Sequence, residues 1–348
     1  MNLNEEPAII GMANALDLDV VQPVEAIKQF CRDKVRRFLR RTSQLSNIEE
    51  LQRLVCKRLN LTVHEIRGDE DIPRLAEYFR SEGEIAAAAA VATQLRPDTF
   101  GMLVQLFHRA KNGRAKFVTF IDCRGEKAAR RVWTIWHEIA HCLTAKDQLA
   151  LPLRRTTVET IEKDPVEKLT DIIAADFAFY EPLFRPVLDS EVGHRGRVTF
   201  RVAERVRDRF NPEASFASTL NACIAKAPAP IILLEAGLAL KKGEQRLVQT
   251  GVASIADFQP SLRVLSSIPN EVAREVMPHI HKQMRVPLDS VIARVRASDM
   301  ATILTGGAAD ESLRNWTTST GGGLPDVAVS IEARKFGDRV VAILTLAA

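Results

Sequence analysis

The chain has 348 residues, of which 46% are hydrophobic and 26% are charged, a balance typical of a folded globular protein. Its formal net charge of +4 is small for this length, so electrostatics do not indicate a nucleic-acid partner, although a local patch could bind DNA. No run approaches the ~20 apolar residues that cross a bilayer, and we therefore expect no membrane partner.

Cysteine usage and the N-terminal sequence indicate the compartment. The five cysteines are scattered and include no Cys-x-x-Cys pair, and an odd number cannot all pair within one chain. The N-terminal segment carries acids where a signal peptide has a basic segment and an apolar core. We therefore expect a reduced, cytoplasmic protein.

Helical periodicity marks the N-terminal part of the chain. Apolar residues recur at spacings of three and four over 24–58, and a basic run, RDKVRRFLRR, lies among them. Such a run can bind phosphate or an acidic protein, but it more often forms a solvated face, which is the interpretation we adopt. A short strand at 61–66 and helical segments through Ala92 should follow. Residues 1–45 are assigned to a helical extension.

The next segments predict a strand and two helices. The run AKFVTFID, residues 115–122, is apolar and β-branched between two turns, which is typical of a strand. Apolar residues then repeat at helical spacing over 128–143. A linker at 151–157 leads to a second helix over 165–180. These elements belong to a predicted domain over residues 46–192.

The first of these helices contains the pattern VWTIWHEIAHCL. His137 and His141 are one helical turn apart, so both imidazoles lie on one helix face and can bind one metal ion. Three protein ligands with an open position for water favour Zn²⁺. Glu138 follows the first ligand and is placed to take a proton from zinc-bound water as a general base. The alternative is a pair of core or surface histidines beside a solvated glutamate, and it leaves their spacing unexplained.

A third ligand is expected on the second helix. Glu167 opens the segment EKLTDIIAADFAFY, which makes it the first choice. Asp171 lies one turn further along the same face, where it could accept the outer N–H of a ligating histidine and fix its tautomer. Tyr180 or His194 could stabilise the oxyanion of a tetrahedral intermediate.

Other polar residues are weaker candidates. Asp176 lies on a different face of the second helix, and Asp164 and Glu162 fall in the expected linker, where solvation or helix capping is the ordinary role. Four other histidines remain, and two of them, His279 and His281, are expected on a later helix, where the side chains of residues two apart diverge. We treat all four as structural or exposed: His64, His108, His279 and His281.

Residues 193–245 predict a small helix-turn-helix-like unit. Two short helices, RVAERVRDRF and SFASTLNACIAK, are separated by Asn211-Pro212 and followed by the strand-like PIILLEAGLAL. Further along, strands alternate with a helix at 270–283 and a glycine-rich turn, TGGGLP. We assign residues 260–348 to a separate α+β domain.

Through VWTIWHEIAHCL and EKLTDIIAADFAFY, the chain resembles the ImmA/IrrE family of bacterial metallopeptidases over roughly residues 50–190. In that family a strand ending in Ile-Asn precedes a helix of the form F-T-x-x-H-E-x-x-H, and a glutamate ligand follows. Ile121-Asp122, Trp133-Thr134 and Glu167 stand in those places here.

Two departures concern the substrate cleft. Asp171 stands where the family commonly has asparagine, and Tyr180-Glu181-Pro182 replaces the usual Leu-Met-Pro.

The resemblance implies a zinc-dependent endopeptidase that cleaves a helix-turn-helix transcriptional repressor and so switches on stress-response or mobile-element genes. It also implies a helix-turn-helix unit and a GAF-like sensor domain behind the peptidase, a layout that residues 193–348 would accommodate. The expected fold is therefore α+β: a zincin-like, mainly helical metallopeptidase domain with a small sheet, then the helix-turn-helix-like unit, then a C-terminal α+β domain.

Two competing functions remain. One is a non-proteolytic regulator that binds DNA or protein and holds a structural metal, and Glu138 argues against it because structural zinc needs no general base. The other, a toxin–antitoxin or phage-defence component, concerns genetic context rather than chemistry.

Overall fold

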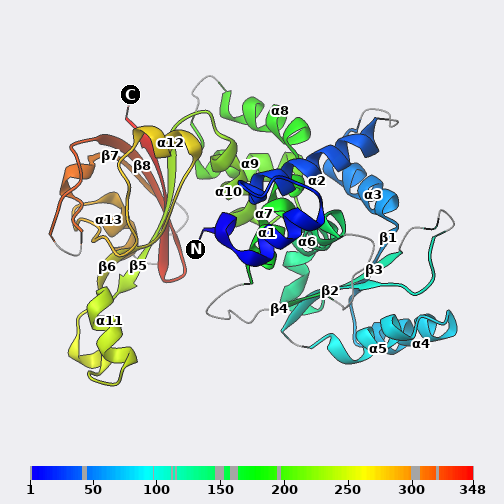
Figure 1. Cartoon of the computed structure of the whole chain (residues 1–348). Coiled ribbons are helices and arrows are strands. Elements are labelled where there is room, and N and C mark those ends of the chain that lie inside the picture. The colour runs from blue at the N-terminus through cyan, green and yellow to red at the C-terminus, as the bar shows by residue number, and fades with distance from the viewer. Residues whose placement is uncertain are drawn as a thin grey trace. The chain divides into compact units, whose positions relative to one another are not determined.

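The structure is a computed structural model, and it describes residues 2–40, 45–96, 98–110, 113, 116–145, 153–156 (backbone only), 164–193, 197–298, 306–318 and 321–347. The protein is of mixed α+β class and contains two sheets, as the sequence predicted. Contacts divide the chain into two compact units, Met1–Val187 with Arg207–Ser215 and Leu188–Val206 with Phe216–Ala348 (Figure 1). The sequence analysis divided the same chain into four segments. Among the described residues, no helix is both long and apolar enough to cross a membrane.

Four strands form the sheet of the first unit: β1 (Leu61–Ile66), β2 (Thr99–Gln105), β3 (Phe117–Asp122) and β4 (Leu153–Thr156). Their order is β1-β3-β2-β4, with β1 parallel to β3 and the other neighbours antiparallel. The predictions of β1 and β3 are confirmed, whereas β2 was not predicted and β4 falls in the predicted linker. β2 is a short buried apolar run, a pattern that does not distinguish a strand from a buried helical segment.

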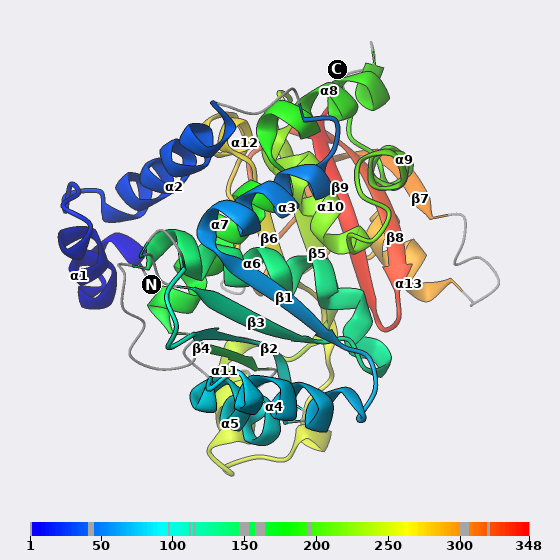
Figure 2. The ribbon, with the colours of Figure 1, turned by 90° about the vertical axis from the view of Figure 1, so that its right-hand side faces the viewer.

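The helices of this unit lie on both faces of the sheet. In Figure 2, α6 lies along one face, while α4 and α5 cover the other. The helices are α1 (Pro7–Ala15), α2 (Pro23–Leu39), α3 (Ile48–Leu59), α4 (Asp71–Ser81), α5 (Ile85–Gln94), α6 (Arg131–Thr144) and α7 (Pro165–Ala178), with short 3-10 turns at η1 (Leu3–Glu5) and η2 (Gly125–Arg130).

The helical region expected over 24–58 consists of two helices. α2 ends at Leu39 and α3 starts at Ile48. The side chain of Asn47 accepts a hydrogen bond from the Glu50 N–H at 2.9 Å, which caps the first turn of α3. The helix predicted over 128–143 is confirmed as α6, with a 3-10 turn before it.

The N-terminus of α7 is fixed by two adjacent residues. The Asp164 carboxylate accepts a hydrogen bond from the Val166 N–H at 2.8 Å, and Pro165 occupies the first helical position. Capping was the ordinary role expected for Asp164, and it is confirmed. The helix ends at Ala178, close to the predicted end, and α8 (Glu181–Val192) begins after a short break.

Asp122 ends β3 in a buried ion-pair cluster. Arg124 donates to it through Nε at 2.9 Å and Nη2 at 2.8 Å, and Lys127 Nζ lies 2.6 Å from Oδ2. Burial alone would raise the pKa of Asp122, but the hydrogen bonds from Arg124 and Lys127 outweigh it and hold the pKa below its ordinary value. The carboxylate is therefore charged and fixes the loop that enters α6.

We expect Asp122→Asn to lower the free energy of unfolding by about 2–3 kcal/mol, because an amide cannot balance the two cations. The side chains of Arg124 and Lys127 remain 25% and 18% exposed, so solvent screens part of the cost. Urea denaturation measures the difference. Asp69→Asn is the matched control, since its carboxylate also pairs with Arg124 but is 88% exposed. Equal effects of the two substitutions would contradict the role assigned to Asp122.

Five strands form the sheet of the second unit: β5 (Ile231–Ala239), β6 (Ser261–Pro269), β7 (Gly307–Ser312), β8 (Ala328–Phe336) and β9 (Arg339–Leu346). Their order is β6-β5-β9-β8-β7, and all neighbours are antiparallel. The sequence analysis placed β5 in the 193–245 segment, but β5 pairs with β6 and β9. That segment therefore shares a sheet with the C-terminal residues.

The helices of the second half of the chain include the two that the sequence predicted on either side of Asn211-Pro212. They are α9 (Phe200–Phe210), which crosses the boundary between the units, and α10 (Phe216–Lys226). The other elements are α11 (Lys242–Gln249), α12 (Glu271–Val276), α13 (Val291–Ala297), η4 (Ile255–Asp257) and η6 (Leu313–Asn315). α12, α13 and the fully buried Trp316 pack on one face of the sheet and form its core.

The helix predicted over 270–283 was too long. α12 ends at Val276, and Pro278 follows, which cannot continue a helix. His279 and His281 are therefore outside a helix. Their ring centroids lie 4.2 Å apart instead of diverging.

Candidate metal centre

α6 packs between the sheet and α7. Its residues from Thr134 to Thr144 are all buried. Trp136, which is 1% exposed, stacks on Phe177 of α7 with ring centroids 6.4 Å apart. The apolar residues that predicted this helix thus anchor it, and they direct the face that carries the two histidines toward α7.

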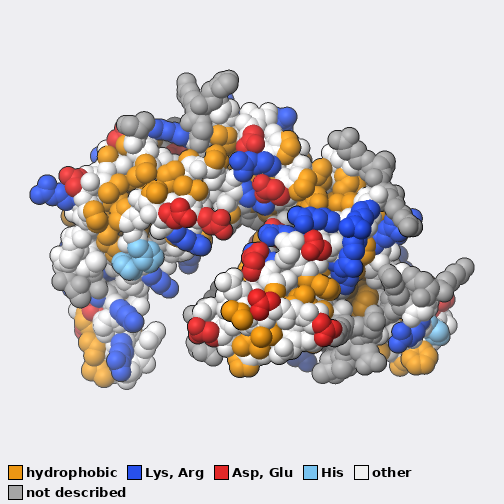
Figure 3. Space-filling view, turned by 45° about the horizontal axis from the view of Figure 1, so that its top comes forward, with side chains coloured by type: hydrophobic (Ala, Val, Ile, Leu, Met, Phe, Trp, Pro, Cys, Tyr) orange, Lys and Arg blue, Asp and Glu red, His pale blue; other side chains and the backbone are white. Residues whose placement is uncertain are grey.

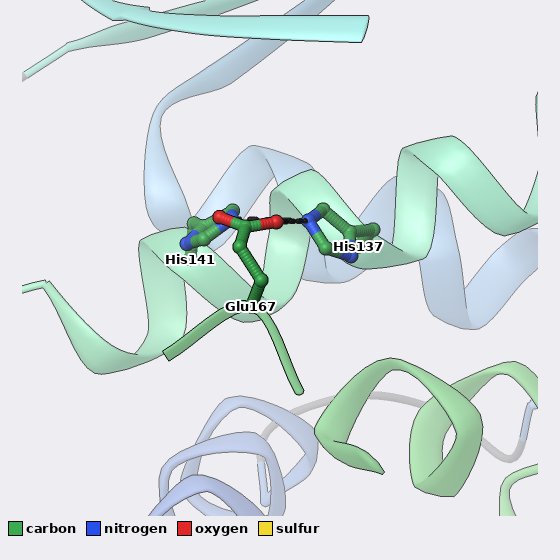
Figure 4. Close-up of side chains that lie close together, drawn as sticks. All are labelled: His137, His141 and Glu167. Atoms are coloured by element: carbon green, nitrogen blue, oxygen red, sulfur yellow. Dashed lines mark hydrogen bonds and ion pairs between the residues drawn. The ribbon is translucent and has the colours of Figure 1, made fainter. Parts of the chain in front are cut away.

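Three side chains from α6 and α7 converge at one point (Figure 4). The Nε2 atoms of His137 and His141 are 3.1 Å apart. Glu167 Oε2 lies 3.1 Å from His137 Nε2, and Glu167 Oε1 lies 3.3 Å from His141 Nε2. One ligand atom of each residue lies within 4.8 Å of the others, so the three residues could hold one metal ion.

The two histidines are deeply buried, while the carboxylate is not. The side chains of His137 and His141 are 2% and 4% exposed, and that of Glu167 is 31% exposed. Burial opposes ionisation of Glu167, but its hydrogen bonds with His137 and His141 outweigh that effect and lower its pKa well below the ordinary range. Glu167 is therefore a carboxylate at every physiological pH.

The donor set fits a divalent metal ion. Two imidazole nitrogens and one carboxylate oxygen are the protein ligands found in catalytic zinc sites, and three such ligands leave a fourth position for water. Without a metal ion, two buried imidazoles and a charged carboxylate would lie together with no cation between them. We conclude that the residues present suit a metal ion with nitrogen and oxygen ligands.

Asp171 contacts the far side of the first histidine. Its Oδ1 lies 3.0 Å from His137 Nδ1, one turn along α7 from Glu167. A hydrogen bond from Nδ1–H to this carboxylate leaves Nε2 with a lone pair that points at the site. The contact that the sequence predicted for Asp171 is therefore present in the structure.

Glu138 lies on a different side of α6, facing β2. It is 1% exposed, and a Cβ added at Gly101 of β2 would lie 3.0 Å from Glu138 Oε1. The same Cβ would lie 2.5 Å from Thr134 Cγ2, far inside van der Waals contact. Because residue 101 is a glycine, there is space between α6 and the sheet for the Glu138 carboxylate. The sequence analysis named Thr134 only for its place in the family pattern and missed Gly101, because no strand was predicted at 99–105 to bring that glycine opposite the motif.

Of the two residues named for oxyanion stabilisation, the structure describes Tyr180. Tyr180 follows the end of α7 opposite to the one that carries Glu167, and the helix from Glu167 to Ala178 rises by roughly 16 Å at 1.5 Å per residue. Burial raises the pKa of Tyr180, and its charged neighbours are Arg36 and Asp176 rather than the two histidines. The oxyanion role of Tyr180 stays a prediction. His194 lies outside the described residues.

The remaining candidates have structural partners. Asp176 forms an ion pair with Arg32 of α2, at 2.6 Å. His64 packs against Phe79 and Phe120, and burial lowers its pKa. His108 Nδ1 lies 2.9 Å from Glu84 Oε1. The structural roles expected for His64 and His108 agree with these contacts, while Glu162 lies outside the described residues.

No protein-family model matches the chain, and no curated protein matches it. It is similar to the solved structure of a Mycobacterium tuberculosis transcriptional regulator, with a TM-score of 0.40 and 9% sequence identity, over 99% of this chain and 82% of that one. A similarity this distant carries no argument about function.

Proposed function

We propose that this chain is a zinc-dependent endopeptidase of the ImmA/IrrE type. The observation that carries the proposal is that α6 presents two metal ligands and, separately from them, a buried glutamate. His137 and His141 meet Glu167 with ligand atoms within 4.8 Å, while Glu138 lies outside that set and faces β2. Hydrolysis by a metal-bound water requires three ligands that leave a position open for the water and a further group that can take its proton, and Glu138, next to His137 in the sequence, is the candidate for that group.

Each residue would then have one task. Zinc, when bound, would lower the pKa of a coordinated water and polarise the scissile carbonyl. Glu138 would accept the proton of the attacking water and pass it to the leaving amine. Asp171 would hold His137 in the tautomer that ligates, through the 3.0 Å contact to Nδ1. The buried α6 and β2 would keep bulk water away from the reacting groups.

The proposed substrate is a helix-turn-helix transcriptional repressor, and the proposed setting is the cytoplasm. We further propose that α9 and α10 belong to a helix-turn-helix-like unit and that the C-terminal sheet belongs to a GAF-like sensor domain. These assignments rest on the family resemblance and on the order of the elements.

The test uses the full chain and a helix-turn-helix repressor, which is to be sought among the genes next to its own. Elemental analysis of the gently purified protein should find about one zinc per chain. Incubation with the repressor should give discrete fragments on a gel, and EDTA should prevent them. Release of the repressor from its operator without fragments, with or without EDTA, would contradict the peptidase and favour a non-proteolytic regulator.

A further inference from the structure

α2 contacts both helices that carry the metal ligands. Its inner face is apolar, with Ile27, Cys31 and Val35 fully buried. Burial raises the pKa of the Cys31 thiol to about 12, so this face stays uncharged. α2 therefore belongs to the core around the ligand-bearing helices and is not a detached extension.

One basic residue of α2 is tied to α7. Arg32 donates to Asp176 through Nε at 2.6 Å and through Nη2 at 3.1 Å, a two-point contact that fixes direction as well as distance. The two side chains are 31% and 21% exposed. Asp176 precedes Phe177, which stacks on Trp136 of α6. The contact therefore holds α7 near the point where α7 packs on α6.

A second basic residue of α2 is tied to α6. Lys34 Nζ donates to the Leu143 carbonyl at 2.9 Å. Leu143 lies in the last turn of α6, where carbonyls have no partner within the helix and a cation is favoured by the helix dipole. His141 is in the same turn. Lys34 therefore fixes the end of α6 that presents the second histidine.

We propose that α2 sets the spacing between α6 and α7 through Arg32 and Lys34, and that these two residues are positioning residues for the metal centre. One ion can be bound by all three ligands, His137, His141 and Glu167, only if α6 and α7 keep their relative position along their axes and the angle between them. Direct packing of Trp136 on Phe177 resists separation of the helices. The two polar contacts from α2 resist sliding of one helix along the other.

The proposal rests on metal binding at the proposed centre but not on peptide cleavage, so its test needs no substrate. Zinc affinity of the full chain is measured by competition with a chromophoric chelator, and the ligand geometry is followed in the visible absorption of the Co²⁺ form. The test variant is R32Q/K34M. We expect it to bind zinc about tenfold more weakly and to show an altered Co²⁺ spectrum, as loss of groups that orient ligands commonly does.

Two further variants separate positioning from general stability. Arg36→Gln removes a cation from the same helix, but Arg36 is 63% exposed and pairs with Asp33 at the surface, so zinc affinity should not change. Lys34→Arg in the wild-type background keeps a donor for Leu143 and should keep the affinity. If R32Q/K34M does not fold, Lys34→Met alone is measured, with a smaller expected loss.

The outcomes are distinguishable. A wild-type chain that binds no zinc or Co²⁺ overturns both this inference and the proposed function. A wild-type chain that binds zinc, together with a folded R32Q/K34M or Lys34→Met variant of equal affinity and unchanged Co²⁺ spectrum, overturns the inference alone. A lower melting temperature with unchanged metal binding would likewise show that α2 only stabilises the fold.

Discussion

Glu138→Gln should keep zinc and the fold but lose peptide cleavage almost completely. Glutamine has nearly the same shape, and Glu138 is not among the residues that meet at the metal centre. The amide cannot accept the proton of the attacking water, and general-base assistance is worth ~10² to 10⁴ in rate. Cleavage of the repressor by wild type and variant, followed on a gel at equal zinc content, measures the effect.

Glu49→Gln serves as the control for this loss of charge. Glu49 lies exposed in the first turn of α3, and its substitution should leave cleavage unchanged. Full activity of Glu138→Gln would refute the assigned role of general base, while zinc loss in that variant would show that Glu138 is itself needed for metal binding.

Substitution of the metal ligands, unlike that of Glu138, should reduce the amount of bound zinc. We expect His137→Ala and His141→Ala to lose stoichiometric zinc, since each removes a buried nitrogen donor from a three-ligand site. Glu167→Ala should weaken binding rather than abolish it, because both histidines remain on one helix face. Elemental analysis after dialysis, followed by competition with a chelator, gives this ranking.

His108→Ala is the histidine control, because His108 pairs with Glu84 away from the metal centre. Its zinc content should equal that of the wild type. If Glu167→Ala keeps both full zinc affinity and activity, the third ligand is another residue and Glu167 does not bind the metal.

The two histidine ligands could be predicted because their geometry is local. The spacing of His137 and His141 fixes their common face as soon as a helix is recognised. The same logic reached Asp171 from Glu167, and the contact with His137 Nδ1 at 3.0 Å agrees with it. Tyr180 was chosen from the same segment, but it follows the last residue of α7, Ala178, so helical periodicity does not show where its side chain lies.

The partners of the ligand-bearing helices could not be predicted. The basic run of α2 was interpreted as a solvated face, yet Lys34 contacts Leu143 and Arg32 contacts Asp176. Both partners are more than a hundred residues away in the sequence, so no local pattern points to them. β2 was missed for a related reason, since only its neighbours in the sheet show which way a short buried apolar run folds.

Gly101 also limits the mutational paths open to this chain. Every other amino acid would add a Cβ, which here lies 2.5 Å from the methyl carbon of Thr134. Serine at 134 would remove that methyl group and keep the hydroxyl that now donates to the Arg130 carbonyl at 3.0 Å. The Glu138 carboxylate, as the end of a flexible side chain, can then shift by a few tenths of an ångström. Two substitutions thus have a fixed order, Thr134→Ser first and Gly101→Ala second, and the reverse order passes through a damaged protein. Descendants of this chain that lack the glycine should carry serine, alanine or glycine in place of the threonine.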